Sequence, residues 1–301
     1  MRILAVLLPL LPLLQEEGSL ARARDRSFPG LTRERQGRWE GPFFFMLLAD
    51  PQFGMAADAG LERRNAEAAV AHINRLRPRF VVVLGDLTHA YPGAKGHEEQ
   101  VADFRRVFGR VDRDIPLLLL PGNHDLGKRA TPEGLAAWRE SFGDDYYAFW
   151  AGGMQGLVLN SHLYWDPSAA PGELERQEEW LAGRLAAARK DPPRHLVVFQ
   201  HHAWFMKSPE DPDGYDLIPR ARRGPALAAL KEAGVRYVFA GHYHGNVRAR
   251  DGDLEMAVLG PLGKPLRKDP SGLGLVEVYP DRLRLTYHAL EAVPESVRLE
   301  P

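Results

Sequence analysis

Five short apolar runs along the chain are each followed by side chains that can bind a metal ion or carry a proton. The runs are Phe43–Leu48, Phe80–Leu84, Ile115–Leu120, Leu196–Phe199 and Val235–Ala240. The segments that follow them are Asp50-Pro51-Gln52, Gly85-Asp86, Gly122-Asn123-His124-Asp125, Gln200-His201-His202 and Gly241-His242-Tyr243-His244. Ligands of open α/β sheets bind beyond the carboxyl ends of the strands, so we expect these side chains to converge.

The residue types indicate a cation site built from oxygen and nitrogen donors. The 301 residues include no cysteine, which excludes thiolate ligands, disulfides and a cysteine nucleophile. Mixed carboxylate, amide and imidazole donors suit Mn, Fe, Zn, Ni or Co. One carboxylate can bridge two cations about 3.5–4 Å apart, which hold a hydroxide for in-line attack on a phosphate ester. The glycines before Asp86, Asn123 and His242 would let the backbone approach such ions closely.

These blocks, in this order, resemble the calcineurin-like metallophosphoesterases. The resemblance covers residues 43–245, and the strings LLADPQFG, PGNHDLG and AGVRYVFAGHYHGN extend it to the Ser/Thr protein phosphatase branch of that family over about residues 43–290. It implies a four-layer α/β/β/α sandwich of two mixed sheets flanked by helices. It also implies a phosphoric ester hydrolase with two divalent metal ions.

The resemblance further implies a role for each matching residue. Asp50 and His244 would hold the first metal with Gln52 beside them, and Asp86 would bridge. Asn123, His201 and His242 would hold the second metal. His124 would protonate the leaving group or orient the phosphate together with Asn123, and Asp125 would set its tautomer. Imidazole suits the acid role because it titrates near neutral pH.

One position departs from the general family pattern, in which the first block reads Asp-x-His. Position 52 is Gln here, as in the phosphatase branch, and an amide oxygen binds a cation more weakly than an imidazole. Phosphomonoester hydrolysis, including phosphoprotein, is the first interpretation. A phosphodiesterase or nucleotidase acting on small metabolites is the alternative, since substrate choice depends on loops. A non-catalytic metal or phosphate binder also stays open.

The remaining pattern predicts the elements that position the site. The apolar runs are continuous, as in strands buried on both faces. Helices are expected at 61–76, 98–108, 134–141, 174–189 and 225–233, the last with Pro225 in its first turn. A hairpin is expected around Gly152-Gly153, and a closing meander over 254–259, 273–279 and 282–288.

Several other residues allow two interpretations each. His89 could contact the substrate phosphate or pack in its loop, and His202 is expected beside the ligand His201 rather than as a ligand. The segment Lys207–Tyr215 could form a lid or a solvated loop, and Arg220, Arg222 and Arg223 could hold a second phosphate or be solvated. The histidines outside every block are expected at the surface or at caps: His72, His97, His162, His195 and His288.

Composition and the N-terminus bound the partners and the compartment. The net charge is −1 without a long basic run, so a nucleic-acid polymer is not expected as a partner. Arg2, the apolar stretch Ile3–Leu14 and Ala21-Arg22-Ala23 are typical of a signal peptide over residues 1–23, and that stretch is too short for a transmembrane span. Export is therefore expected, followed by a polar linker at 24–41, the phosphoesterase domain at 42–292 and a tail at 293–301. The oligomeric state cannot be inferred.

Overall fold

The computed structural model describes residues 20–58 and 60–299. The strands are β1 Phe43–Leu48, β2 Val81–Val83, β3 Leu117–Leu119, β4 Tyr147–Ala151, β5 Met154–Val158, β6 His195–Phe199, β7 Val235–Ala240, β8 Val247–Asp251, β9 Leu254–Val258, β10 Gly272–Val278 and β11 Leu283–Ala289. The helices are α1 Arg33–Gln36, α2 Leu61–Leu76, α3 His97–Phe108, α4 Asn123–Leu126, α5 Pro132–Phe142, α6 Ser161–Trp165, α7 Glu173–Lys190, α8 Arg220–Glu232 and the 3₁₀ turn η1 Leu290–Ala292.

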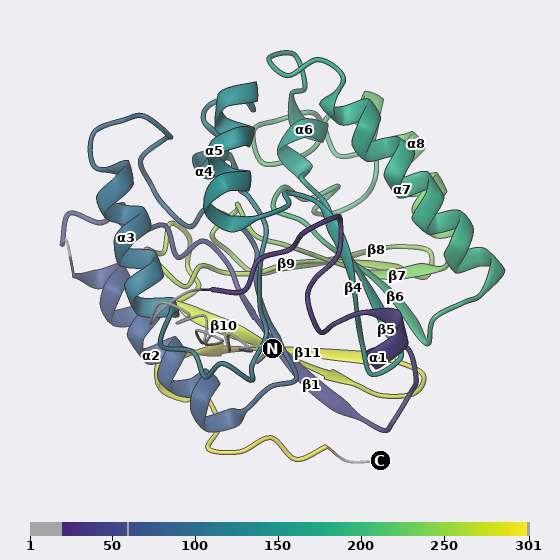
Figure 1. Cartoon of the computed structure of the whole chain (residues 1–301), viewed down its shortest axis with the longest axis horizontal. Helices are drawn as coiled ribbons and strands as arrows, with labels where there is room; N and C mark the ends of the chain where they lie inside the picture. The colour runs from purple at the N-terminus through teal and green to yellow at the C-terminus, as the bar shows by residue number, and fades with distance from the viewer. Residues whose placement is uncertain (1–19, 59, 300–301) are drawn as a thin grey trace, which may run out of the picture.

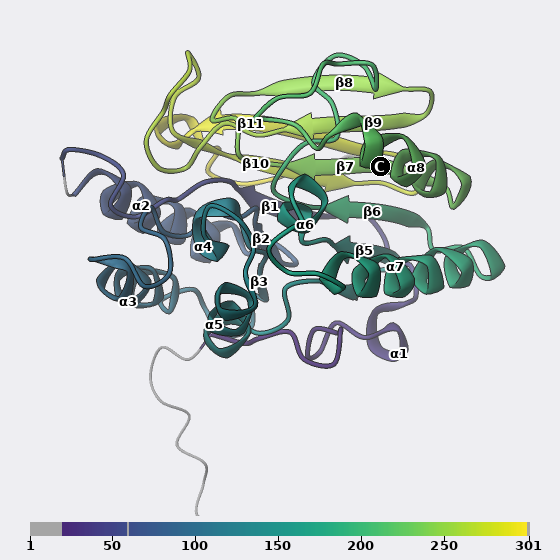
Figure 2. The same cartoon turned by 90° about the horizontal axis from the view of Figure 1, so that it is seen from above.

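These strands form two mixed sheets. One has the order β11-β10-β1-β2-β3, with β1, β2 and β3 parallel, and the other has the order β4-β5-β6-β7-β9-β8, with parallel strands between two antiparallel edges. Figure 1 shows α2 and α3 on one side of the strands and α7 and α8 on the other, and Figure 2 shows the same layers from above. The expected four-layer sandwich is confirmed.

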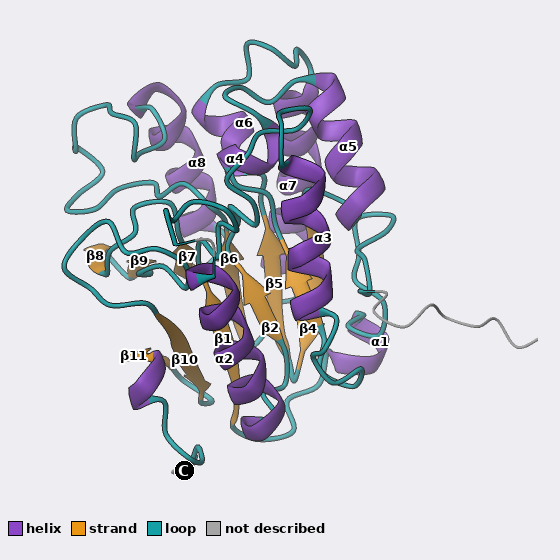
Figure 3. Cartoon of the chain, turned by 90° about the vertical axis from the view of Figure 1, so that its left-hand side faces the viewer, coloured by secondary structure: helices purple, strands orange, loops and turns teal. Residues whose placement is uncertain are grey.

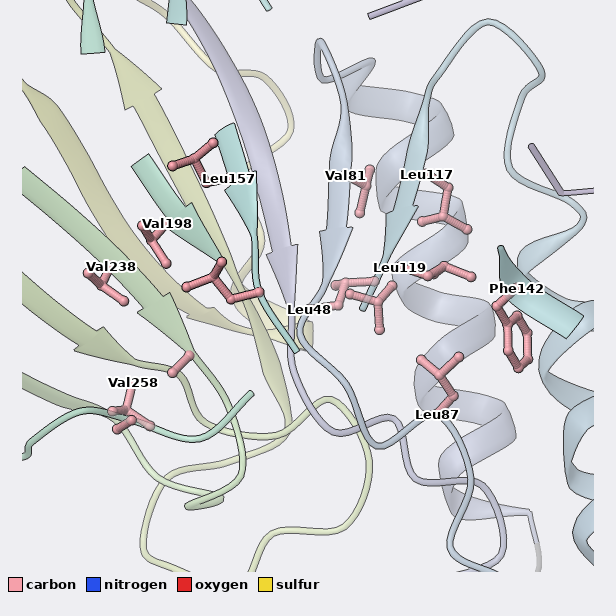
Figure 4. Packing of buried hydrophobic residues seen from close by; sticks show 14 of the residues in the cluster. Leu48, Val81, Leu87, Leu117, Leu119, Phe142, Leu157, Val198, Val238 and Val258 are labelled. Atoms are coloured by element: carbon pink, nitrogen blue, oxygen red, sulfur yellow. The ribbon is translucent and has the colours of Figure 1, made fainter. Parts of the chain in front are cut away.

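Alternation along the strands builds the layers. In β1, Phe45 belongs to a buried cluster that also contains Phe199 and Phe239 of the other sheet, with ring centroids 5.9 and 6.1 Å from Phe45. Met46 and Leu48 of the same strand belong to a second cluster shared with the helices. Successive side chains of a strand point to opposite faces, so each sheet buries both faces. Figure 4 shows part of the second cluster, including Val81 and Leu117 of one sheet and Val198 and Val238 of the other.

Most element boundaries match the sequence pattern within two residues, but two predictions are wrong. The expected closing meander is split, because β9 pairs with β7 and β8 in one sheet while β10 and β11 complete the other. Helix α8 begins at Arg220 instead of Pro225, with Pro219 as its N-cap, which places Pro225 inside the helix. The hairpin forms as expected, with both turn glycines at positive φ (53° and 83°).

The segment expected to be a polar linker packs against the domain. Phe28 and Leu31 are 2% and 5% exposed, and Ser27 forms a bridge to Ala148. Ala23, the last residue of the expected signal peptide, forms a bridge to Gly143. The guanidinium of Arg26 lies 3.5 Å from the ring centre of Tyr146 and 3.2 Å from Asp145. Hydrophobic periodicity missed this segment because its contacts are made by isolated side chains and backbone bridges.

The C-terminal residues of the described chain also contact the core. The expected tail begins with buried Val293, and Val297 packs against the same core. The signal peptide expected over residues 1–23 lies, up to residue 19, outside the described residues. Among the described residues, each helix is too short or too polar to cross a membrane. Figure 3 shows α2 and α3 running beside the strands whose ends carry the residues considered next.

Candidate metal centre

The predicted ligands come from the ends of strands in both sheets, and they meet. Atoms that could bind a metal on Asp86, His201 and His242 all lie within 4.8 Å of one another, and all three residues are buried. Asp86 follows β2 of one sheet, whereas His201 and His242 follow β6 and β7 of the other. The cluster therefore lies where the two sheets face each other beyond the strand ends.

Three residues beside Asp86 form what we call the second-metal side: Asn123, His201 and His242. The Nε2 atom of His201 lies 3.4 Å from Oδ1 of Asp86 and 3.1 Å from Oδ1 of Asn123. The amide oxygen, the imidazole nitrogen and the carboxylate oxygen thus face one small volume. This donor set suits a borderline divalent cation.

Three other residues form the first-metal side: Asp50, Gln52 and His244. The Nε2 atom of His244 lies 3.8 Å from Oδ1 of Asp50, and Nε2 of Gln52 lies 3.5 Å from Oδ2 of Asp86. Gln52 is 2% exposed, and its Oε1 is buried without a hydrogen-bond partner. A buried acceptor without a donor is costly, and a cation at this place would satisfy it. The residues present therefore fit the two-metal expectation.

Backbone carbonyls hold the three ligand imidazoles. Nδ1 of His201 faces the oxygen of Leu84 at 2.8 Å, and Nδ1 of His244 faces that of Lys264 at 2.9 Å. His242 uses its other nitrogen, since its Nε2 lies 3.2 Å from the carbonyl oxygen of Tyr215. A carbonyl accepts a hydrogen bond only from a protonated nitrogen, which leaves the opposite nitrogen of each ring free for a metal. The arrangement assigns Nε2 of His201 and His244, and Nδ1 of His242, as the ligand atoms.

The backbone at this centre is strained. Eight non-glycine residues of the described chain have positive φ, and five of them are predicted ligands. These are Asp50 (48°), Gln52 (39°), Asp86 (50°), His242 (69°) and His244 (55°). Left-handed conformations cost such residues about 1–2 kcal/mol each, and they gather where function fixes the geometry. Their clustering here supports a functional centre independently of residue type.

Glycine is required next to two of these ligands. A Cβ on Gly85, which has a φ of 86°, would lie 2.6 Å from Nδ1 of His201. A Cβ on Gly241 would lie 2.8 Å from Oδ2 of Asp50. The expected close approach of backbone to the centre is therefore observed at both positions.

Burial and mutual contact shift the pKa values of the cluster. Burial raises the pKa of Asp50 to about 6, although the nearby imidazoles oppose it. Burial would also raise the pKa of Asp86, but the adjacent His201 outweighs it and lowers that pKa. Burial would lower the pKa of His201, yet Asp86 and Asp50 raise it to about 9, whereas burial and His201 lower the pKa of His242 to about 3. Charges of both signs are thus concentrated in one buried volume, where a bound cation would stabilise the charged carboxylates.

His124 lies next to this centre, and its ring stacks against two aromatic side chains. Its ring centroid is 5.0 Å from that of His89 and 5.0 Å from that of Tyr91, and both pairs are nearly parallel. Its backbone N–H donates to Oδ1 of Asp86 at 2.9 Å, and its Nδ1 lies 2.5 Å from the carbonyl oxygen of His89. This leaves Nε2 to face a substrate, as a proton donor requires.

The role expected for Asp125 is wrong. Oδ1 of Asp125 accepts from the backbone N–H groups of Leu87 and Thr88, and Oδ2 accepts from that of Gly122. The carbonyl of His89, instead of Asp125, fixes the tautomer of His124. Asp125 instead ties the loop that carries Asp86 to the turn that carries Asn123, and burial and Asp86 raise its pKa to about 7.

Other candidates also find partners. His89 packs on His124, and burial lowers its pKa. His202 lies 4.3 Å, ring to ring, from His242, as expected of a neighbour of a ligand. His162 and His195 were expected at the surface or at caps, but they are 0% and 6% exposed. His162 stacks on His202 at 5.5 Å, and Nε2 of His195 lies 2.7 Å from the carbonyl oxygen of Tyr279. Hydrophobic pattern gave no signal for His162, because α6, which carries it, is only five residues long.

The three arginines proposed for a second phosphate all have protein partners. Arg220 pairs with Glu210 at 2.8 Å, and Arg222 donates to the carbonyl of Trp165 at 3.3 Å. Arg223 is 1% exposed and donates to three backbone carbonyls, those of Pro209, Asp211 and Ile218. Residues 207–219 are therefore a loop that Arg223, in the first turn of α8, holds through its guanidinium.

Comparison with known sequences gives consistent matches. The family model described as calcineurin-like phosphoesterase matches residues 45–246. Serine/threonine-protein phosphatase CPPED1 of Danio rerio is 39% identical over 93% of this chain and 95% of its own length. The human CPPED1 protein is 40% identical over 93% and 94%. Purple acid phosphatase 15 of Arabidopsis thaliana is 22% identical over 70% of this chain and 43% of its own length.

Solved structures share the fold at low identity. A dimetal phosphatase from Danio rerio superposes with a TM-score of 0.59 at 18% identity, covering 83% of this chain and 97% of its own. Purple acid phosphatase PPD1 from yellow lupin superposes with a TM-score of 0.62 at 15% identity, covering 85% and 52%. The matched family model and the CPPED1 relatives show that this chain belongs to the calcineurin-like phosphoesterase family and is a phosphoric ester hydrolase.

Proposed function

We propose that this enzyme is a phosphatase that hydrolyses phosphomonoesters, with phosphoserine and phosphothreonine side chains as the substrate class. The observation that carries the proposal is His124, whose Nδ1 is engaged by a carbonyl while its amide is bonded to the expected bridging residue, Asp86. A proton donor in this place serves hydrolysis, whereas simple binding does not need one. The names of the CPPED1 relatives support the phosphoprotein substrate class.

The donor set determines what a bound metal pair would contribute. Two divalent cations, of Mn, Fe, Zn, Ni or Co, would supply Lewis acid activation of water and would neutralise the phosphate charge. Asn123, His201 and His242 would hold one cation and Asp50, Gln52 and His244 the other, with Asp86 between these two sets of residues. His124 delivers the proton that the leaving oxygen needs.

The leaving group gives the sharpest test of His124. We expect His124→Ala to lower kcat by about 10²–10⁴-fold on an alkyl phosphate such as a phosphoserine peptide. The loss should be much smaller on p-nitrophenyl phosphate, because nitrophenolate departs with little need of a proton. The matched control is His97→Ala, a histidine outside the centre at the start of α3.

Three outcomes would revise the proposal. Equal rates for parent and His124→Ala on both substrates would favour a metal or phosphate binder. An equal loss on both substrates would remove the proton-donor role. Faster hydrolysis of bis-p-nitrophenyl phosphate than of the monoesters, in a panel run with Mn²⁺, would favour a phosphodiesterase.

We also propose that residues 1–23 direct export of the enzyme. The proposal depends on the sequence pattern alone: Arg2, the apolar stretch Ile3–Leu14 and the small residues Ala21 and Ala23. Mass spectrometry of the mature N-terminus tests it. A chain that keeps Met1 and stays in the cytoplasm would contradict it.

A further inference from the structure

Tyr215 lies directly on the second-metal side, although it follows His201 by 14 positions in a polar loop. Its hydroxyl oxygen accepts from Nδ2 of Asn123 at 3.2 Å, and its own carbonyl oxygen faces Nε2 of His242 at 3.2 Å. Its ring centroid is 4.7 Å from that of His242 and 6.1 Å from that of Trp165. One residue therefore contacts two of the three second-metal donors.

Tyr215 is also open to solvent. It is 58% exposed, and within residues 20–58 and 60–299 the only other exposed large apolar side chains are Tyr91 and Leu266. Tyr91 covers His124, so both of these exposed phenol rings border the same centre. Exposed aromatic side chains beside a buried donor cluster are typical of a surface that a ligand covers.

Hydrogen bonds from Arg223 and to Asp211 hold the loop that carries Tyr215. Arg223 donates to the carbonyls of Pro209, Asp211 and Ile218 at 2.7–3.1 Å. The carboxylate of Asp211 accepts from the backbone N–H groups of Met206 and Lys207 at 2.7 and 2.8 Å. The position of Tyr215 is therefore set before any substrate arrives.

The phenol has a hydrogen-bond donor to offer. Nδ2 of Asn123 donates to the oxygen of the phenol, so the O–H proton of Tyr215 remains available to another acceptor. The amide oxygen of Asn123, Oδ1, lies 3.1 Å from Nε2 of His201 on the second-metal side. An acceptor bound beside Asn123 would therefore lie next to the phenol, whose oxygen is 3.2 Å from Nδ2 of Asn123.

We propose that Tyr215 binds substrate by donating its O–H to a phosphoryl oxygen of the phosphoester on the second-metal side. The proposal rests on the proposed function, since it names a further binding residue of the same centre. It assigns the loop 207–219 a definite task, which is to place this hydroxyl beside Asn123.

Tyr215→Phe is the direct test, because it removes the hydroxyl and keeps both the ring and the carbonyl that holds His242. The probe is inorganic phosphate, titrated calorimetrically into the Mn²⁺-loaded protein. We expect its dissociation constant to rise about tenfold, as the loss of one hydrogen bond to a charged group predicts. Calorimetric Mn²⁺ titration of the metal-free variant should match the parent within about twofold.

Tyr146→Phe is the matched control, since Tyr146 packs against Arg26 on the N-terminal segment and does not touch the centre. It should bind phosphate and Mn²⁺ as the parent does. The melting temperature of Tyr215→Phe should also equal that of the parent, because the ring is largely exposed.

The outcomes separate this inference from the proposed function. Unchanged phosphate affinity in Tyr215→Phe would overturn the inference, and so would a parallel loss of Mn²⁺ affinity, which would mean that Tyr215 acts only through Asn123. A parent that binds phosphate, weakened by Tyr215→Phe, but hydrolyses no monoester would overturn the proposed function and leave the phosphate contact standing.

Discussion

The two sides of the metal centre differ in how firmly their donors are held. On the second-metal side, His201, His242 and Asn123 each have a further partner, in Leu84 or Tyr215. On the first-metal side, the carbonyl of Lys264 holds His244, but Gln52 has only the long 3.5 Å contact between its Nε2 and Oδ2 of Asp86. Outer contacts that orient metal ligands contribute about 10–100-fold in metal affinity. We therefore expect the second-metal side to fill first and the first-metal side to limit activity at low metal concentration.

Asp86 lies between the two sides, so replacing it should impair both of them and cause the largest loss of activity. Asp86→Asn keeps the shape but loses the charge between the sides, and we expect kcat/KM on p-nitrophenyl phosphate to fall by about a thousandfold, or about 4 kcal/mol. The exposed Asp114→Asn is the matched control. An Asp86→Asn enzyme within tenfold of the parent, with two metals by elemental analysis, would refute a bridging role.

Loosening the loop that carries Tyr215 should lower metal affinity on the second-metal side alone. Arg223→Met leaves one buried and two part-buried carbonyls without their donor, so we expect the free energy of unfolding to fall by about 3 kcal/mol, measured with urea. Mn²⁺ affinity should fall on the second-metal side. Arg220→Met, which removes an exposed pair with Glu210, should change stability by less than about 1 kcal/mol. Equal losses in the two variants would contradict the anchoring role.

Acid should destabilise the stacked imidazoles of His162 and His202, of which His202 contacts His242 of the second-metal side. Burial lowers the pKa of His162 to about 4. Between its ordinary value and 4, the unfolded chain binds a proton that the folded chain does not, so stability is lost as pH falls through that window. Between pH 7.5 and 5.0 in EDTA, the parent should lose about 2 kcal/mol more than His162→Gln, because the ordinary histidine pKa is about 6.5. Equal losses would show that His162 is charged in the folded protein.

Improving the weaker donor should narrow the gap between the sides. Gln52→His replaces an amide oxygen by an imidazole nitrogen, and we expect the weaker Mn²⁺ dissociation constant to fall about tenfold, or about 1.4 kcal/mol, with Gln52→Ala moving it the other way. The tighter constant is the internal control. If both constants move together, Gln52 serves both ions.

The sequence could predict the strands and the ligands because both depend on short stretches of neighbouring residues. A continuous apolar run such as Phe43–Leu48 predicts a buried strand, and the residue after it must lie at the strand end. Strand pairing is not local, so the assignment of β9 and β10 to different sheets could not be read from their patterns.

The missed parts of the centre depend on contacts between distant segments. Tyr215 reaches Asn123 only because a buried arginine shapes its loop, and a loop residue carries no periodic signal. The partner of His124 is a main-chain carbonyl, which no residue type reveals, so the neighbouring carboxylate of Asp125 was the misleading choice.

The left-handed backbone of the ligand positions has a consequence for how such a centre changes over time. Gln52 keeps a φ of 39° although an amide holds a cation more weakly than an imidazole does, so the surrounding frame, rather than the donor, fixes the main chain there. A point substitution at such a position exchanges the ligand without rebuilding the scaffold. Preference among metals can therefore drift one side chain at a time while the architecture stays constant.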